Sequence, residues 1–299
     1  MQDTDVARVE QFIRHLTTER RLSPHTALSY QRDLQSLLKW CELAGVRAWR
    51  ELDEQHLRLF AARSHSGGLS PRSVQRRLSA IRSFLRYLGR EGLISRDPGT
   101  DVRAPKAARR LPTTLDVDQM SRLLSFSADT PLAKRDLAIM ELFYSSGLRL
   151  AELVSLDLTD LDLGDQTVRV TGKGNKTRIV PVGAKALEAV RHWLAIRHDW
   201  ARIGEQAMFV SQRGQRLTSR SIQLRISYWA RKQGLPVHVH PHLFRHSFAS
   251  HMLESSQDLR GVQELLGHAD ISTTQVYTHL DFQHLARIYD QSHPRARKR

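Results

Sequence analysis

The sequence predicts a mainly α-helical protein of two domains, with a small β-sheet in the second domain. The chain has 299 residues, more than one domain usually contains. Residues 1–106 show only the three- and four-residue spacing of amphipathic helices, whereas the later part adds two alternating segments joined by a turn. A Pro-rich, basic and non-periodic stretch separates the two parts. We therefore predict domains at 1–106 and 115–299, with residues 107–114 as the linker.

The first domain carries clear helix start and stop signals. Ser23-Pro24 and Ser70-Pro71 each place an N-cap residue before a proline at the first helical position. Gly45 and the Gly67-Gly68 pair are expected stops. The expected helices cover about residues 6–16, 24–40, 53–65 and 71–88.

The fourth of these helices has an apolar side and an arginine-rich remainder. Guanidinium groups fit phosphate oxygens with two parallel hydrogen bonds, so this helix is a candidate for lying along a DNA backbone. A solvated charged face explains the same pattern equally well. The residues expected to contact DNA here and at the linker are Arg72, Arg76, Arg77, Arg82 and Lys106.

Charge supports a polyanionic partner. The chain has 46 Lys plus Arg against 31 Asp plus Glu, a net charge of +15, and its pI is near 10.6. Residues 1–110 contain 21 basic and 12 acidic side chains, and the remainder is basic as well. Nucleic acid is the usual partner of such a protein, although an unspecialised basic surface gives the same numbers.

The second domain begins with helical patterns at about residues 116–126 and 132–145. Gly147 then breaks the pattern and places Arg149 near the start of a new helix, where it can bind an anion or simply pair with Glu152 on the helix surface. Residues 167–170 and 177–182 alternate as a hairpin, with Lys173 in its turn, and residues 208–210 are a candidate third strand. Further helices are expected at about 184–198, 219–233, 243–254, 258–266, 272–277 and 281–290.

Residues 242–277 contain the most informative chemistry. His242 and His246 flank Arg245, Gly267 precedes His268, and Tyr277 follows nine residues later. Metal-free cleavage of a phosphodiester needs cations for the nonbridging oxygens, a hydroxyl nucleophile and groups that move protons. A phenol suits this task because its pKa near 10 keeps a phosphotyrosyl link reversible. Each part is a weak signal alone, but the block is specific.

Three stretches together resemble the tyrosine recombinases, also called the lambda-integrase family. They are SSGLRLAELVSLDLTDLDL, VTGKGNKTRIVPV, and HLFRHSFASHMLE followed by LLGHADISTTQVYTH. The resemblance covers nearly the whole chain and implies the tyrosine recombinase fold, a C-shaped two-domain DNA clamp whose helical N-terminal domain is SAM-like and binds core DNA. The sequence departs from the family pattern at Ser145-Ser146, where Thr-Gly is common, and at Phe244, where Leu is common. Neither change removes a catalytic group.

The resemblance also implies a role for each site residue. Tyr277 is the nucleophile that forms a 3′-phosphotyrosyl bond, and Arg149 and Arg245 hold the scissile phosphate. His242 helps accept the tyrosine proton. His268 hydrogen-bonds a phosphate oxygen, and Lys173 protonates the 5′ oxygen. No metal or other cofactor is needed by this chemistry, since the covalent link keeps the bond energy.

The implied partners are double-stranded DNA at a specific chromosomal site, a second recombinase of the same family in a heterotetramer, and a DNA translocase. The last helix, near residues 282–289, is expected to dock on a neighbouring protomer. The alternatives are a phage or transposon integrase, a non-catalytic DNA-binding protein on this fold, zinc binding by the histidines around His242, and Tyr277 as an ordinary half-buried aromatic residue.

The remaining signals predict a cytoplasmic protein. The N-terminus, M-Q-D-T-D, has neither the basic start nor the apolar run of a secretory signal. No apolar stretch reaches the length of a membrane span. Cys41 is the single cysteine, so no internal disulfide can form.

Overall fold

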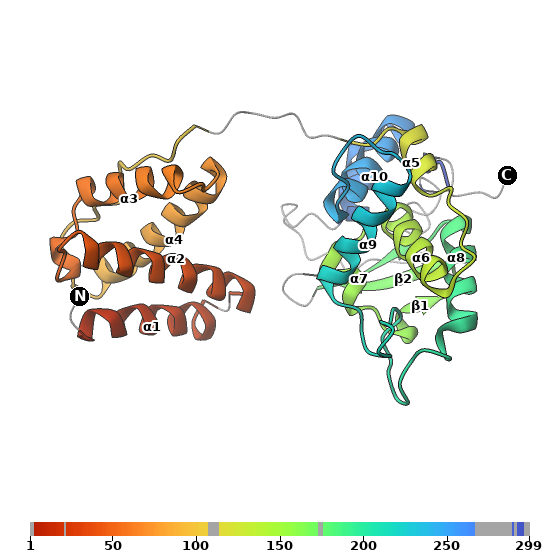
Figure 1. Ribbon diagram of the computed structural model, residues 1–299, viewed down its shortest axis with the longest axis horizontal. Helices are drawn as coiled ribbons and strands as arrows, with labels where there is room; N and C mark the ends of the chain where they lie inside the picture. Colours follow the sequence, from red (N-terminus) through yellow and green to blue (C-terminus); the bar gives the residue numbers. More distant parts are fainter. Residues whose placement is uncertain are drawn as a thin grey trace. The chain divides into compact units, whose positions relative to one another are not determined.

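The computed structural model contains two compact units, residues 1–111 and 112–299 (Figure 1). The structure describes residues 3–20, 22–106, 114–172, 176–266, 289 and 292–295. Within these residues no helix is both long enough and apolar enough to span a bilayer.

The described residues of the N-terminal unit form four α-helices and a short 3-10 turn. They are α1 (Asp3–Thr18), α2 (Pro24–Leu43), η1 (Trp49–Glu51), α3 (Glu54–Ser66) and α4 (Pro71–Arg90). The caps explain where the helices begin, since the side chains of Ser23, Asp53 and Ser70 each accept a hydrogen bond from the backbone three residues on. The four predicted helices are therefore confirmed. Their inward faces enclose one apolar core that includes Phe12, Leu34 and Phe84.

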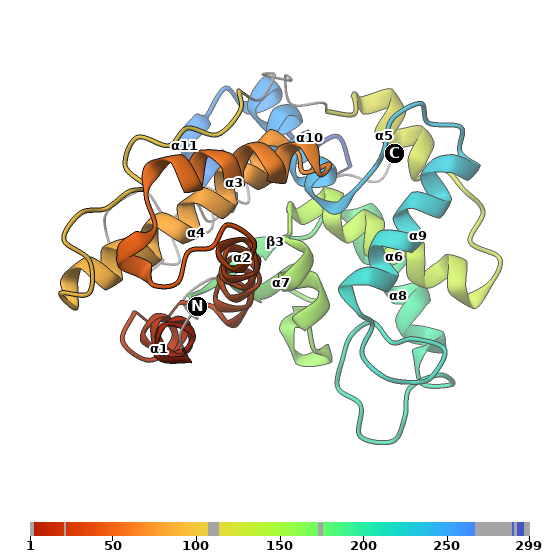
Figure 2. The same ribbon diagram turned by 60° about the vertical axis from the view of Figure 1, so that its left-hand side comes forward.

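The second unit is also mainly helical. Its elements are α5 (Val117–Leu123), α6 (Pro131–Ser146), α7 (Leu150–Ser155), η2 (Leu158–Asp160), β1 (Leu161–Asp162), β2 (Thr167–Thr171), β3 (Thr177–Pro181), α8 (Ala184–Arg197), α9 (Ser219–Lys232), α10 (Pro241–Ser256) and α11 (Leu259–Leu266). The three strands form one antiparallel sheet in the order β1-β2-β3. In the two views α6 lies against α8, its main packing partner, and α9 (Figure 2).

The predicted hairpin is confirmed as β2 and β3, but the predicted third strand is wrong. The third strand is β1, not residues 208–210. The 207–210 segment is held instead by single bridges between Asp157 and Ala207 and between Val210 and Arg216. The residues of this segment are apolar because they lie in the core, where Ala207, Met208 and Val210 are fully buried. A short buried run looks the same in sequence whether it is a strand or an irregular core segment.

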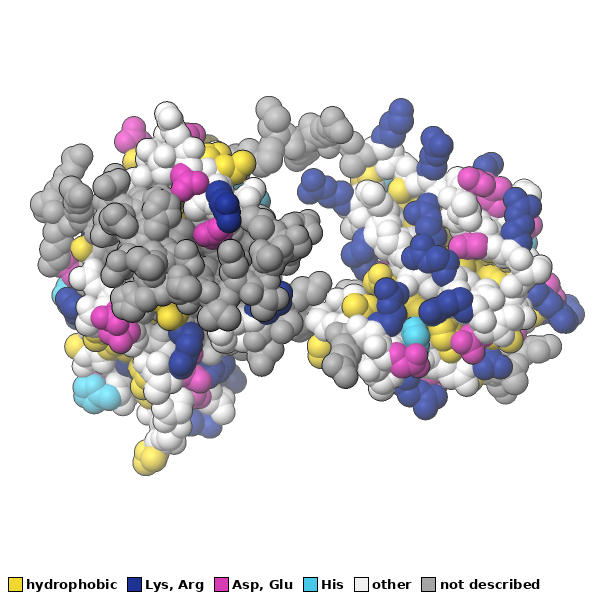
Figure 3. All heavy atoms as spheres, turned by 180° about the vertical axis from the view of Figure 1, so that it is seen from behind, with side chains coloured by type: hydrophobic (Ala, Val, Ile, Leu, Met, Phe, Trp, Pro, Cys, Tyr) yellow, Lys and Arg dark blue, Asp and Glu magenta, His cyan; other side chains and the backbone are white. Residues whose placement is uncertain are grey.

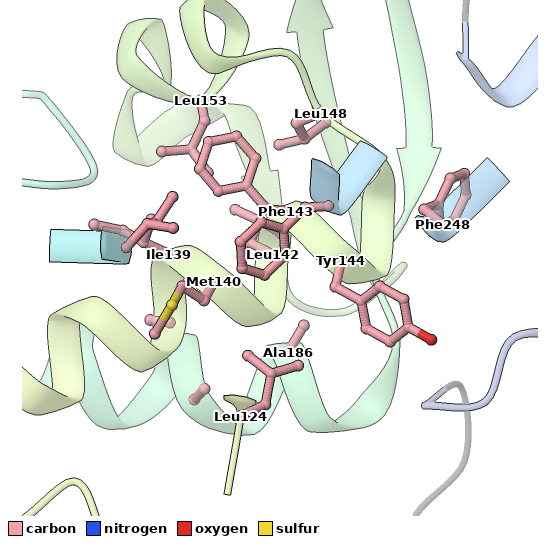
Figure 4. Close-up of a cluster of buried hydrophobic side chains, with 14 of the residues drawn as sticks. Leu124, Ile139, Met140, Leu142, Phe143, Tyr144, Leu148, Leu153, Ala186 and Phe248 are labelled. Atoms are coloured by element: carbon pink, nitrogen blue, oxygen red, sulfur yellow. The ribbon is translucent and has the colours of Figure 1, made fainter. Parts of the chain in front are cut away.

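Helix α6 is the centre of the second core. Every residue from Ala138 to Ser146 is buried, so this part of the helix is enclosed on all sides. Figure 4 shows Phe143 and Leu142 surrounded by residues of neighbouring elements, including Leu153 from α7 and Ala186 from α8. The same helix leads directly into Gly147 and Arg149, so the core fixes the start of the candidate site.

The described end of the chain packs on its own unit. The Tyr289 hydroxyl and the Ser145 hydroxyl are 2.6 Å apart, and Tyr289 is only 1% exposed. His293 Nε2 lies 3.1 Å from the Tyr144 carbonyl oxygen, and Arg295 pairs with Glu141. Tyr289 ends the segment that the family resemblance expects on a neighbouring protomer, and here it contacts α6 of the same chain.

We expect Phe143→Ala to destabilise the second unit by about 3–5 kcal/mol, because a fully buried aromatic side chain would leave a cavity in a close-packed core. Urea unfolding followed by fluorescence would measure this. Leu224→Ala, which truncates a half-exposed apolar side chain on α9, is the control and should change the free energy of unfolding little. Equal losses for the two variants would contradict the central role of α6.

Candidate active site

The turn after α6 requires glycine for two reasons. Gly147 has a φ of +56°, a left-handed conformation that side chains disfavour. A Cβ at this position would also lie 2.5 Å from Cδ1 of Phe248 on α10. This close approach brings the turn against α10 and leaves Arg149 at the N-cap of α7.

Glu152 is the carboxylate around which the site is built. Its side chain is only 2% exposed, and its Oε1 accepts a 2.8 Å hydrogen bond from Arg149. Arg178, from β3, donates to both carboxylate oxygens at 2.8 and 2.9 Å. Arg149 thus pairs with Glu152, as one of the two sequence interpretations had it, but the pair is at a buried carboxylate and not on an open helix surface. Arg149 itself keeps 38% of its side chain exposed.

Electrostatics keeps Glu152 ionised. Burial by itself would raise the pKa of this carboxyl, but the hydrogen bonds and charge of Arg178, followed by those of Arg149, lower the pKa to about 2. One negative charge is therefore shared between two guanidinium groups.

Arg245 is buried more deeply than Arg149. It lies on α10, is 9% exposed, and donates to the Gly147 carbonyl at 2.6 Å and to the Leu266 carbonyl at 2.5 Å. Burial, together with the positive charges of Arg149 and Arg178, lowers the pKa of Arg245 to about 10. Burying the Arg245 guanidinium against neutral carbonyls costs free energy in the folded state, and an anionic ligand beside it would reduce that cost.

His242 lies one turn before Arg245 on α10 and is exposed. His238, His240 and His242 form a row, with ring centroids 5.9 and 6.3 Å apart in turn. Burial and the neighbouring histidines lower the pKa of His240. Among the described residues, no group of three or more His, Cys, Asp or Glu side chains is arranged to hold a metal ion.

Three predicted catalytic residues, Lys173, His268 and Tyr277, lie outside the described residues. The residues on either side of the 173–175 turn are described, and so is the helix that ends at Leu266. The Gly172 amide donates to the Lys176 carbonyl at 2.8 Å and closes the hairpin on either side of Lys173. Arg245 donates to the last carbonyl of α11, that of Leu266, which precedes His268 by two residues. The structure thus brings Arg149, Arg245, the base of the β2–β3 hairpin and the end of α11 to one place in the unit.

The basic residues predicted to contact DNA have mixed surroundings. Arg72 and Lys106 are exposed. Arg76 and Arg77 both pair with the buried Asp33, and Arg77 also reaches Ser64. Arg82 donates to the carbonyls of Gly99 and Val102. Arg76 still has half of its side chain exposed, so an internal partner and a phosphate contact are compatible there.

Lys and Arg side chains cover much of one face of the N-terminal unit, which is on the right in Figure 3. Acidic side chains are fewer on that face. This distribution suits a polyanion along the surface.

Two residues of the site were not predicted from the sequence as parts of it, Glu152 with its buried position and Arg178. A signal for Arg178 was present. In β3 the alternation places Arg178 and Val180 inward, whereas Ile179 is 55% exposed. An arginine at a core-facing strand position needs a carboxylate partner, and Glu152 is that partner.

Two family models match the chain. The phage integrase family matches residues 113–284, and the N-terminal SAM-like domain of phage integrases matches residues 9–92. The first match alone spans more than half of the chain. The chain belongs to the phage integrase family.

Relatives define the protein more closely. Tyrosine recombinase XerC of Pseudomonas syringae pv. tomato is 55% identical over 97% of both chains, and XerC of Azotobacter vinelandii is 56% identical over 98% of both. The protein is a tyrosine recombinase, and its activity is site-specific DNA recombination. The predicted family is therefore confirmed.

Solved structures confirm the fold class. The Tn1549 transposon integrase in complex with circular intermediate DNA aligns with a TM-score of 0.71 at 19% identity, covering 93% of this chain and 97% of that one. The XerH recombinase bound to a palindromic difH substrate aligns with a TM-score of 0.69 at 21% identity, covering 94% and 83%. The shared fold is a mainly helical two-domain integrase fold with a small antiparallel sheet.

We expect Glu152→Gln to flatten the acid side of the stability profile. Because the folded-state pKa lies near 2, below the ordinary 4.5, ionised Glu152 stabilises the fold above pH 4.5 and loses this contribution as pH falls towards 2. The contribution is about 3 kcal/mol. Urea unfolding from pH 2 to 7 would show a shallower dependence in the variant, and parallel curves would contradict the assignment.

Proposed function

We propose that this recombinase cuts and rejoins DNA through a 3′-phosphotyrosyl intermediate at Tyr277. The observation that supports it most is the pair of arginines, Arg149 and Arg245, held together beside a single buried carboxylate. In this proposal the two arginines stabilise the negative charge that grows on the nonbridging oxygens of the scissile phosphate.

The remaining roles follow the family resemblance. Tyr277 attacks the phosphate and frees a 5′ hydroxyl, with His242 helping to accept the phenolic proton. Lys173 returns a proton to the 5′ oxygen, and His268 hydrogen-bonds the phosphate. A second attack by a 5′ hydroxyl on the phosphotyrosyl bond rejoins the strand, so neither ATP nor a metal ion is required by these steps.

We further propose that the protein acts in the cytoplasm as a XerC-type recombinase with the partner XerD. The two would form a heterotetramer on two dif sites, exchange strands through a Holliday junction and resolve chromosome dimers at cell division. The FtsK translocase would activate one pair of cleavages. The support is the identity of 54–56% to several proteins named XerC and the likeness in fold to XerH on difH.

The N-terminal unit is proposed to bind the duplex. Its contribution would come from the exposed side chains of Arg72 and Arg76, with Lys106 at the start of the linker. The guanidinium groups of Arg77 and Arg82 already have acceptors within the protein. We propose that these two residues hold the neighbouring surface in shape and contact the DNA backbone only at their margins.

We expect Tyr277→Phe to bind DNA as tightly as the wild type and to form no covalent complex, because only the phenolic oxygen is lost. The assay uses a nicked dif-like duplex that traps the cleaved strand, EDTA in the buffer, and denaturing and native gels. Lost binding would mean that Tyr277 is structural. Binding by the wild type without a covalent band, even when XerD is added, would favour a non-catalytic DNA-binding protein.

We expect Arg245→Ala to slow cleavage by about 100- to 1000-fold or more, as for loss of a main transition-state charge partner. Single-turnover cleavage at saturating protein measures this. Arg245 also holds two carbonyls, so Arg245→Lys and the melting temperature of each variant serve as controls for folding. A wild-type rate in Arg245→Ala would remove this residue from the site.

A further inference from the structure

Arg178 is a buried cation to which neither the motifs nor the proposed mechanism assigns a task. It lies in β3, opposite Val170 of β2, and is 8% exposed. The hairpin formed by these strands carries Lys173 in its turn. Arg178 is therefore the nearest buried charged residue along the strand that leaves this turn.

The guanidinium group of Arg178 joins two further segments. Its two terminal nitrogens bind both oxygens of Glu152, the residue that in turn fixes Arg149. Its Nε donates to the Leu265 carbonyl at 3.3 Å. Leu265 is in the last turn of α11, where carbonyls have no partner within the helix and where a cation is favoured by the helix dipole.

Arg178 and Arg245 thus share the end of α11 between them. Arg178 binds the carbonyl of Leu265, and Arg245 binds that of Leu266. The next residues in the chain are Gly267 and His268, and Tyr277 follows.

We propose that Arg178 is a positioning residue of the recombination site, which aligns the Lys173 hairpin, the Glu152–Arg149 pair and the end of α11 with one another. It touches no reacting atom and acts through Glu152 and the Leu265 carbonyl. The proposal rests on the proposed function, because its consequence is measured in the cleavage step.

The contacts require arginine in particular. Three nitrogens of one planar group serve three acceptors, two on a carboxylate and one on a helix end. A lysine ammonium is a point charge and cannot span this set with the same geometry. Arg178→Lys keeps the charge beside Glu152 and removes the alignment, which separates positioning from simple neutralisation.

The test compares DNA affinity with single-turnover cleavage of the nicked duplex for Arg178→Lys and Arg178→Met. We expect affinity within about twofold of the wild type and cleavage slower by about 100-fold, the usual result of a misplacement near 1 Å. Arg169→Met is the matched control. Arg169 lies on the adjacent strand, is exposed and pairs with Asp160, so its loss should leave cleavage unchanged.

A double variant tests the route of action. Arg178→Met leaves Glu152 with less compensation and can impair folding, whereas Arg178→Met with Glu152→Gln removes both charges of the pair. If Arg178 acts mainly through Glu152, the double variant cleaves little more slowly than the slower single variant, because only the bond to the Leu265 carbonyl is left to disturb. Multiplied effects would show independent actions and overturn the route.

Three other outcomes overturn the proposal. If the wild type forms its covalent product and Arg178→Lys cleaves at the wild-type rate, the positioning role is contradicted and the proposed function is not. Affinity, melting temperature and cleavage that all fall together show a general structural role. A wild-type protein that forms no covalent product, with XerD present, contradicts the proposed function first and this inference with it.

Discussion

Glu152 is one carboxylate buried among arginines, and the arrangement of the site depends on how its charge is shared. Arg149 and Arg178 bind it directly, and Arg245 lies close enough to feel its charge. Removing the carboxylate would leave three cations to repel one another in a poorly solvated place. Keeping it holds Arg149 and Arg178 in place around one negative charge.

The same interactions connect segments far apart in sequence. The Gly147 turn, α10 and the end of α11 meet at Arg245, and β3, α7 and the end of α11 meet at Arg178. Arginine suits such junctions because its planar group serves several acceptors at once. The enclosed helix α6 provides the rigid base, since it carries the turn and packs against α8 and α10. The same helix thus belongs to the core and positions the site in this unit.

The sequence predicted the helices well because their ends have local causes. Ser23, Asp53 and Ser70 cap helices through their own side chains, and Gly147 marks a left-handed turn, all of which short-range patterns reveal. The third strand was predicted wrongly because β1 has only two residues, too few to show alternation, while the buried run at 208–210 resembled a strand.

The site was predictable in kind and not in its connections. Motifs identified Arg149 and Arg245, but the burial of Glu152 depends on β3, which approaches only through the tertiary fold. The arginines of α4 show the converse. Sequence alone could not distinguish a side chain facing DNA from one like Arg82, which binds carbonyls of the following loop. Long-range partners of a charged side chain leave no periodic trace in the chain.

The charge balance at Arg245 can be tested with a duplex whose scissile phosphate is replaced by an uncharged methylphosphonate. If Arg245 stabilises phosphate charge in the transition state, the wild type should cleave the charged substrate far faster than the neutral one, and Arg245→Ala should lose most of that preference. Cleavage rates of both substrates by both proteins give the answer. An equal preference in Arg245→Ala and the wild type would contradict the account.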